Sequence, residues 1–135
     1  NCKHKCKGCH SPHLQTDIGD SLTSLNIKPI IDKYHKYISC ILFMGGEQDI
    51  KTLNELCNWI KTEYNLKTAI YSGMHESYFD YLANNLSVDY IKVGRYEESL
   101  GGLESSLTNQ KMYAKDKDNG SWIDITDKFK KKFKV

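Results

Sequence analysis

Several features are scarce in this sequence of 135 residues, and each scarcity excludes a class of protein or a kind of partner. No apolar run approaches the roughly 20 residues that a membrane-spanning helix needs, and no secretion-signal pattern is visible at the start. The formal net charge is only +2, which is too small to predict nucleic acid as a partner. An odd total of 5 cysteines argues against a disulfide framework and for a reducing compartment. We therefore expect a cytoplasmic protein with neither nucleic acid nor a membrane as its partner.

The two ends of the chain are unusual. The sequence begins at Asn1 without a methionine, and its cysteine motif starts at the next residue, so we expect that an upstream element is missing or was removed. At the other end, lysines are concentrated in residues 128–135. We interpret this lysine-rich tail as a solvated segment, and a docking patch for an acidic partner is the alternative.

Short apolar runs predict the strands. Residues 40–44 form a continuous apolar run that predicts a strand buried on both faces, and residues 68–71 and 90–93 predict two more. Residues 111–114 and 122–125, separated by a turn sequence, predict a hairpin.

Apolar residues at helical spacing predict three helices between these strands. They cover about residues 27–34, with Pro29 in the first turn, and about 53–65 and 79–86. Strands that alternate with helices predict βαβ units and a mostly parallel sheet, that is, an α/β fold.

The chain is long enough for one domain with one core. We divide this single domain, 1–135, into a cysteine loop (1–24), a βα core (25–94), a C-terminal loop with the hairpin (95–127), and the lysine-rich tail.

Glycines follow the carboxyl end of each strand predicted for the parallel sheet. They are Gly45, Gly46, Gly73 and Gly94. Ligands of parallel α/β sheets bind along this edge, and glycine lets the backbone approach a ligand closely. We therefore expect a ligand site there.

The five cysteines fall into two groups. Cys2, Cys6 and Cys9 lie within eight residues, a density that predicts a chemical role. Cys40 and Cys57 are distant and lie on apolar segments, and we interpret both as small buried hydrophobes.

Three chemistries compete for the cysteine loop. The first is zinc, with His4, His10 or His13 as a fourth ligand, although this chain can build a core without a structural metal. The second is covalent haem attachment, because residues 6–10 fit the C-x-x-C-H pattern, although that chemistry requires export in most systems. The third is an iron–sulfur cluster that three cysteines hold with one iron left open.

The spacing Cys-x3-Cys-x2-Cys, followed by Gly-Gly-Glu at 45–47, resembles the radical S-adenosylmethionine (SAM) superfamily. Within that superfamily, residues 6–12 and 92–110 resemble the activating proteins of anaerobic ribonucleoside-triphosphate reductase. The similarity extends from the first residues to about Tyr113.

The resemblance implies a [4Fe–4S] cluster bound by Cys2, Cys6 and Cys9, whose fourth iron chelates the amino and carboxylate groups of SAM. Gly45 and Gly46 would admit its methionine moiety. The resemblance also implies that Glu47 contacts the SAM ammonium group, that Gly8 and His10 lie beside the adenosine, and that Ser72 and Lys92 contact the carboxylate or ribose. Cys9, between Gly8 and His10, belongs to the cofactor site as a cluster ligand.

The implied fold is a partial (βα) barrel whose N-terminal strand is missing here. The implied activity is reductive cleavage of SAM, which yields methionine and a 5′-deoxyadenosyl radical that makes a glycyl radical on the reductase. The implied partners are that reductase and a low-potential electron donor such as flavodoxin or ferredoxin. No acid, base or nucleophile from the protein is required. The alternatives are a radical SAM enzyme with a different protein or small-molecule substrate, and a non-enzymatic zinc-binding module.

Overall fold

The computed structural model describes residues 3–9, 12–15 and 19–131. Helices and strands alternate through most of this part of the chain. In order they are α1 (Ser24–Tyr34), β1 (Cys40–Phe43), α2 (Ile50–Tyr64), β2 (Lys67–Tyr71), α3 (Phe79–Asn85), β3 (Tyr90–Val93), β4 (Lys111–Lys115) and β5 (Trp122–Asp124). Each predicted strand and helix is confirmed, with bounds that shift by at most three residues.

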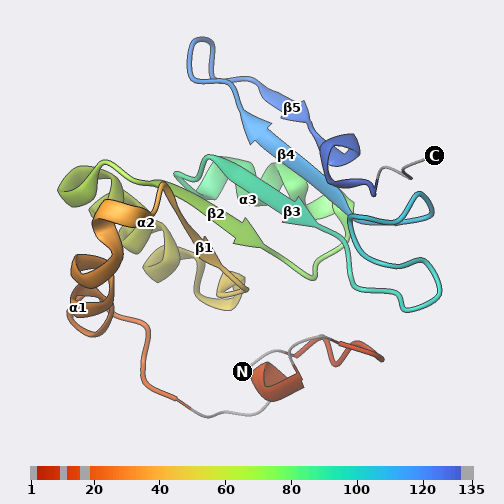
Figure 1. Ribbon diagram of the computed structural model, residues 1–135, viewed down its shortest axis with the longest axis horizontal. Helices are drawn as coiled ribbons and strands as arrows, with labels where there is room; N and C mark the ends of the chain where they lie inside the picture. The colour runs from red at the N-terminus through yellow and green to blue at the C-terminus, as the bar shows by residue number, and fades with distance from the viewer. Residues whose placement is uncertain (1–2, 10–11, 16–18, 132–135) are drawn as a thin grey trace.

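The five strands form one mixed sheet in the order β1-β2-β3-β4-β5 (Figure 1). β1, β2 and β3 run parallel, and β4 and β5 form the predicted hairpin, antiparallel to β3. The sheet is therefore parallel in its first half only. The partial barrel stays a prediction.

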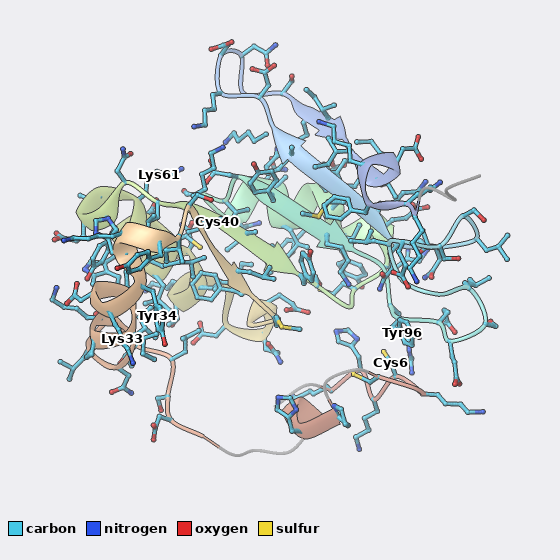
Figure 2. The ribbon with its side chains drawn as sticks, viewed as in Figure 1. Cys6, Lys33, Tyr34, Cys40, Lys61 and Tyr96 are labelled. Carbon is cyan, nitrogen blue, oxygen red and sulfur yellow. The ribbon has the colours of Figure 1, made fainter. Side chains whose placement is uncertain are left out.

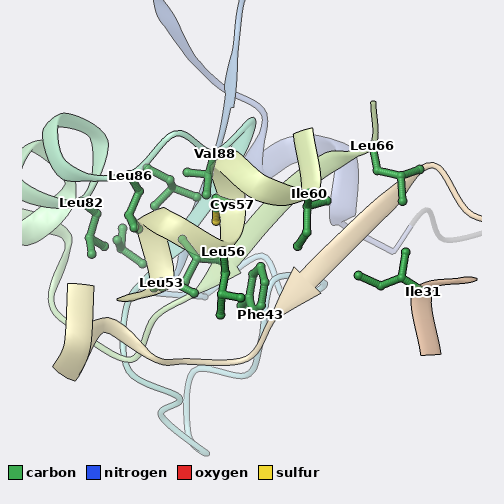
Figure 3. Packing of buried hydrophobic residues seen from close by; sticks show 13 residues of the cluster. Ile31, Phe43, Leu53, Leu56, Cys57, Ile60, Leu66, Leu82, Leu86 and Val88 are labelled. Carbon is green, nitrogen blue, oxygen red and sulfur yellow. The ribbon is translucent and has the colours of Figure 1, made fainter. Parts of the chain in front are cut away.

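The core lies on one face of this sheet, where α2 and α3 pack against the parallel strands (Figure 3). Ile70 and Ile91 are paired across β2 and β3, and both are fully buried. Cys57 of α2 is fully buried as well, as predicted. Burial of these side chains fixes the strands and hence the position of their carboxyl ends.

The opposite face of the sheet is open. It holds a hollow of about 350 Å³ lined by Cys40, Leu42, Ala69, Tyr71, Tyr90, Met112, Ile125 and Phe129. The prediction that residues 40–44 are buried on both faces is therefore wrong: Leu42 is 42% exposed and Met44 is 58% exposed. The reason is position, because β1 lies at an edge of the sheet and no helix in the described residues covers this face.

Helix α1 begins earlier than predicted. Thr23 caps it by accepting a hydrogen bond from the backbone N–H of Asn26 at 3.1 Å. Pro29 consequently lies inside the helix rather than in its first turn. The apolar stripe of α1 is only partly used, since Ile31 is buried while Ile30 remains exposed. None of the helices in the described ranges combines the length and apolar composition needed to cross a bilayer.

Candidate functional site

The carboxyl ends of β1, β2 and β3 meet at one edge of the sheet, and the cysteine loop lies against that edge. Figure 1 shows the N-terminal segment beyond the arrowhead of β1. Contacts of His4 with residues that follow β1 and β2 fix this arrangement. The topology therefore brings Glu47, Ser72 and Lys92, which the resemblance implies for the SAM site, to the same side of the molecule as Cys6.

Glu47 occupies the centre of this arrangement. It starts a short 3-10 turn, η3 (Glu47–Asp49), directly after Gly46, and its side chain is only 8% exposed. Its Oε1 accepts a hydrogen bond from Ser72 Oγ at 3.0 Å and lies 3.4 Å from His4 Nε2. Its Oε2 is buried and has no hydrogen-bond partner among the residues that the structure describes. A buried carboxylate oxygen without a donor is costly, and this one is available for a cationic donor such as an amine.

Gly45 and Gly46 give this end of β1 its shape. Their φ angles of 108° and 103° are in a region that side chains disfavour. A Cβ at either position would meet only ordinary contacts, with Glu47 Oε2 at 3.7 Å from Gly45 and Leu53 at 3.6 Å from Gly46. These glycines are therefore required by the backbone conformation rather than by close packing, since a Cβ would fit beside its neighbours at both positions.

The other two strand ends are filled by the chain itself. A Cβ on Gly73 would lie 2.7 Å from the ring of His4. A Cβ on Gly94 would lie 2.9 Å from the Cα of Gln110 and 3.0 Å from the carbonyl oxygen of Asn109. Glycine is required at both places for packing within the protein.

Lys92 is buried near the end of β3 on the open face of the sheet. Its Nζ donates to the carbonyl oxygen of Gly94 at 3.3 Å and lies 5.5 Å from the centre of the Tyr71 ring. Burial lowers the pKa of Lys92, and the negative charges of Cys6 and Glu47 oppose that shift. A cation held between a carboxylate and a cysteine suits an anionic ligand group, and this role of Lys92 stays a prediction.

Ser72 is fully buried at the end of β2. Its hydroxyl donates to Glu47 and accepts from the backbone N–H of Met74 at 3.1 Å. Here it positions Glu47, and its predicted contact with SAM stays a prediction.

The cysteine loop is compact where it is described. Cys6 and Cys9 are partly buried and joined by a turn, in which the Cys9 N–H donates to the Cys6 carbonyl oxygen at 3.3 Å. Gly8 has a φ of 73°, and a Cβ there would meet the Glu98 side chain at 3.0 Å.

The full ligand set is not contained in the described residues, since Cys2 and His10 lie outside them. Within the described part, no three His, Cys, Asp or Glu side chains approach closely enough to hold a metal ion. The assignment of the cluster to Cys2, Cys6 and Cys9 therefore stays a prediction.

The two remaining cysteines are poorly placed to be ligands. Cys40 starts β1, at the opposite end of that strand from Gly45, and lies far from Cys6 in Figure 2. Cys57 lies in the core on α2. Burial raises the pKa of Cys40, and it raises the pKa of Cys57 to about 11, which disfavours the thiolate that binds metals. Cys40 is only partly buried, so its interpretation as a buried hydrophobe was only half right.

A cavity of about 390 Å³ opens beside the carboxylate. Its lining residues are Lys3, His4, Glu47, Gln48, Met74, Tyr78 and Tyr81. The cavity therefore joins the cysteine loop, the end of β1 and the start of α3, which is room for a small organic molecule that reaches both loop and carboxylate.

Two contacts of the site were missed at the level of sequence. His4 was considered only as a zinc ligand, whereas it contacts Glu47. No sequence pattern pointed to Glu98, because its contact with Gly8 joins residues that are ninety positions apart in the sequence.

Comparison with known proteins supports an iron–sulfur cluster as the ligand of the cysteine loop. A family model described as a 4Fe-4S single cluster domain matches residues 1–113. No curated protein and no solved structure gives a significant match.

Proposed function

The chain belongs to the family of 4Fe-4S single cluster domains, and from that premise we propose that it is a radical SAM activase acting on anaerobic ribonucleoside-triphosphate reductase. In this proposal Cys2, Cys6 and Cys9 hold the cluster, which leaves one iron open to SAM. We extend the proposal to a partial (βα) barrel fold and to a cytoplasmic location.

One observation carries the SAM proposal: the buried carboxylate of Glu47, whose Oε2 has no donor within the described residues. Ser72 fixes one oxygen of this carboxylate, and the other is buried beside Gly45, 3.7 Å from where a Cβ of that residue would lie. An ammonium group bound there would satisfy the oxygen and neutralise the charge. Within a 4Fe-4S domain, the α-amino group of SAM is a ligand of that kind.

The surrounding residues fit the rest of such a ligand. Gly45 and Gly46 leave backbone and space accessible at the end of β1, and Lys92 provides a buried cation for a carboxylate. Cys2, Cys6 and Cys9 would hold the reduced cluster, and the chemistry it would supply is one electron for cleavage of SAM between the sulfur and the 5′ carbon into methionine and a 5′-deoxyadenosyl radical. The contribution of the chain is to bind the two ends of the methionine moiety and to keep water from the reacting atoms.

The open face of the sheet supports a large substrate. Its apolar hollow is uncovered, and Lys92, at the cofactor end of the sheet, lies on that same face. A polypeptide segment that bears the target glycine would dock against such a face more readily than a small metabolite, which requires enclosure. The electron would come from a low-potential donor such as flavodoxin or ferredoxin.

The first experiment is anaerobic reconstitution with iron and sulfide, followed by electron paramagnetic resonance (EPR) of the reduced protein with and without SAM. A [4Fe–4S]⁺ signal that shifts on addition of SAM is expected, and Glu47→Gln should abolish the shift while the cluster remains. Cys6→Ala and Cys9→Ala should lose the cluster, whereas Cys40→Ala, the matched control, should keep it. A signal that SAM leaves unchanged, or stoichiometric zinc without a cluster, would contradict the proposal.

The second experiment tests the partner. The reduced protein with SAM and the reductase should yield a glycyl-radical EPR doublet on the reductase and one 5′-deoxyadenosine per radical. SAM cleavage without this doublet would indicate a radical SAM enzyme with another substrate.

A further inference from the structure

His4 has no role in the proposed cofactor site, although it lies in the cysteine loop between Cys2 and Cys6 and contacts Glu47. We propose that His4 is a positioning residue that orients the Glu47 carboxylate, so that its Oε2 faces the amine of SAM. This inference rests on the proposed function and assigns a residue of the cysteine loop to recognition of the amine.

The two oxygens of Glu47 have different surroundings, and His4 contributes to the difference. Oε1 accepts a hydrogen bond from Ser72 Oγ at 3.0 Å and lies 3.4 Å from His4 Nε2. Oε2 has no hydrogen-bond partner among the described residues. An ionised carboxylate only accepts hydrogen bonds, so Nε2 of His4 carries the proton in this contact. Two donors on one oxygen oppose rotation of the carboxylate, which would exchange the oxygens.

Gly73 allows His4 to reach this position. The ring of His4 lies so close to Gly73 that a Cβ there would be 2.7 Å from Cδ2, 2.9 Å from Cγ and 3.0 Å from Nε2. Real side chains do not tolerate such contacts, so the ring sits where only glycine admits it. The ring of His4 thus packs against Gly73 after β2, and it contacts Glu47 after β1.

The position of His4 links the cysteine loop to the proposed amine site at Glu47. His4 is two residues from Cys2 and from Cys6, and its ring is about one-third exposed while Glu47 is 8% exposed. A contact between a ligand-bearing loop and a buried carboxylate sets the distance between them. His4 therefore connects the cysteine loop to the proposed amine site.

The test compares His4→Asn with His4→Gln in the reconstituted full chain. The amide nitrogen of glutamine reaches the place of Nε2, whereas that of asparagine reaches only the place of Nδ1. SAM affinity, measured by EPR titration of the cluster, should fall about tenfold in His4→Asn, the lower end of what outer-shell partners contribute. It should recover in His4→Gln, with iron content equal in both.

A SAM analogue that lacks the α-amino group sharpens this comparison. Its affinity should be the same in the wild type and in His4→Asn, because it has no amine for Glu47 to recognise. An equal loss for SAM and for the analogue would overturn the inference, since His4 would then act through general packing.

Gly73→Ala is a second variant that leaves His4 in the sequence. Its new methyl group should displace the ring and reproduce the fall in SAM affinity, and the double variant with His4→Asn should bind no more weakly than either single variant. Additive losses would overturn the inference.

One measurement needs neither cluster nor SAM. A long-range ¹H–¹⁵N NMR spectrum of the full chain at mildly alkaline pH should show the His4 proton on Nε2. That preference should disappear in Glu47→Leu, which removes the acceptor. A proton on Nδ1 in the wild type would overturn the inference and leave the proposed function standing, whereas a wild-type cluster signal that ignores SAM would refute the function itself.

Discussion

The ends of β1 and β3 are alike in sequence and different in structure. Each strand is an apolar run that stops at glycine, and Gly46 and Gly94 have nearly the same φ, 103° and 104°. The end of β3 is closed by the backbone of residues 109–110, whereas a Cβ at the end of β1 would meet only ordinary contacts, beside a buried carboxylate oxygen that has no donor among the described residues. Two glycines with the same conformation thus have different roles: Gly94 allows close packing within the protein, and Gly46 belongs to the proposed ligand site.

The largest effect is expected at the closed end. Gly94→Ala adds a Cβ that meets backbone atoms, which cannot move away as a side chain can, and it forces alanine into a disfavoured φ. Together these should lower the free energy of unfolding by about 3 kcal/mol or more. Urea denaturation followed by circular dichroism measures this, and a loss below that of Gly46→Ala would break the comparison.

Gly46→Ala should have a smaller effect on stability and a larger one on binding. Its Cβ meets only the Leu53 side chain at 3.6 Å, so the cost is mainly that of backbone conformation, about 1–2 kcal/mol. The altered backbone at the proposed SAM site should nevertheless remove the SAM-dependent shift of the cluster EPR signal. A variant that is destabilised but binds SAM normally would show that the open end is not a binding site.

Gly120→Ala is a control that measures the cost of backbone conformation alone, against which the destabilisation by Gly94→Ala and Gly46→Ala can be compared. Gly120 lies in the hairpin turn with a φ of 71°, and no atom lies within 4 Å of the Cβ position. Its substitution should cost about 1 kcal/mol from backbone conformation alone and leave SAM binding unchanged. A cost as large as that of Gly94→Ala would mean that conformation rather than packing distinguishes the two strand ends.

The smallest effect on stability is expected for Glu47→Gln, and with the opposite sign. Loss of a buried charge with one unsatisfied oxygen should raise the free energy of unfolding by up to about 1 kcal/mol, while SAM binding is lost. The same urea denaturation measures it. A strongly destabilised variant would indicate that the carboxylate supports the fold rather than a ligand.

Much of the fold was predictable because burial leaves a local signature. Tyr90–Val93 was predicted with the bounds that the structure has, since a short apolar run between turn residues has few alternatives. The same reasoning failed for Leu42, because the pattern of one strand does not reveal whether it lies at an edge. Pro29 was misplaced because the capping by Thr23 was not recognised.

The site was predictable where residues follow strands. The strand-end glycines predicted a ligand site at the edge that the carboxyl ends of parallel strands share, and the resemblance added Glu47, Ser72 and Lys92 to it. The contact of His4 with Glu47 was not predictable, since it depends on how a loop folds back over the sheet. Whether a strand-end glycine faces protein or open space is likewise a property of segments distant in sequence, as Gly94 and residues 109–110 illustrate.

The exposed edge of β1 has a consequence for handling the protein in solution. Leu42 and Met44 are exposed there, and no strand in the described residues pairs with the outer side of β1. Such an edge is a template for pairing between molecules. A formal net charge of +2 provides little mutual repulsion, and added salt screens it further. Reversible self-association that grows with protein concentration and ionic strength is therefore expected, and light scattering would detect it well before precipitation.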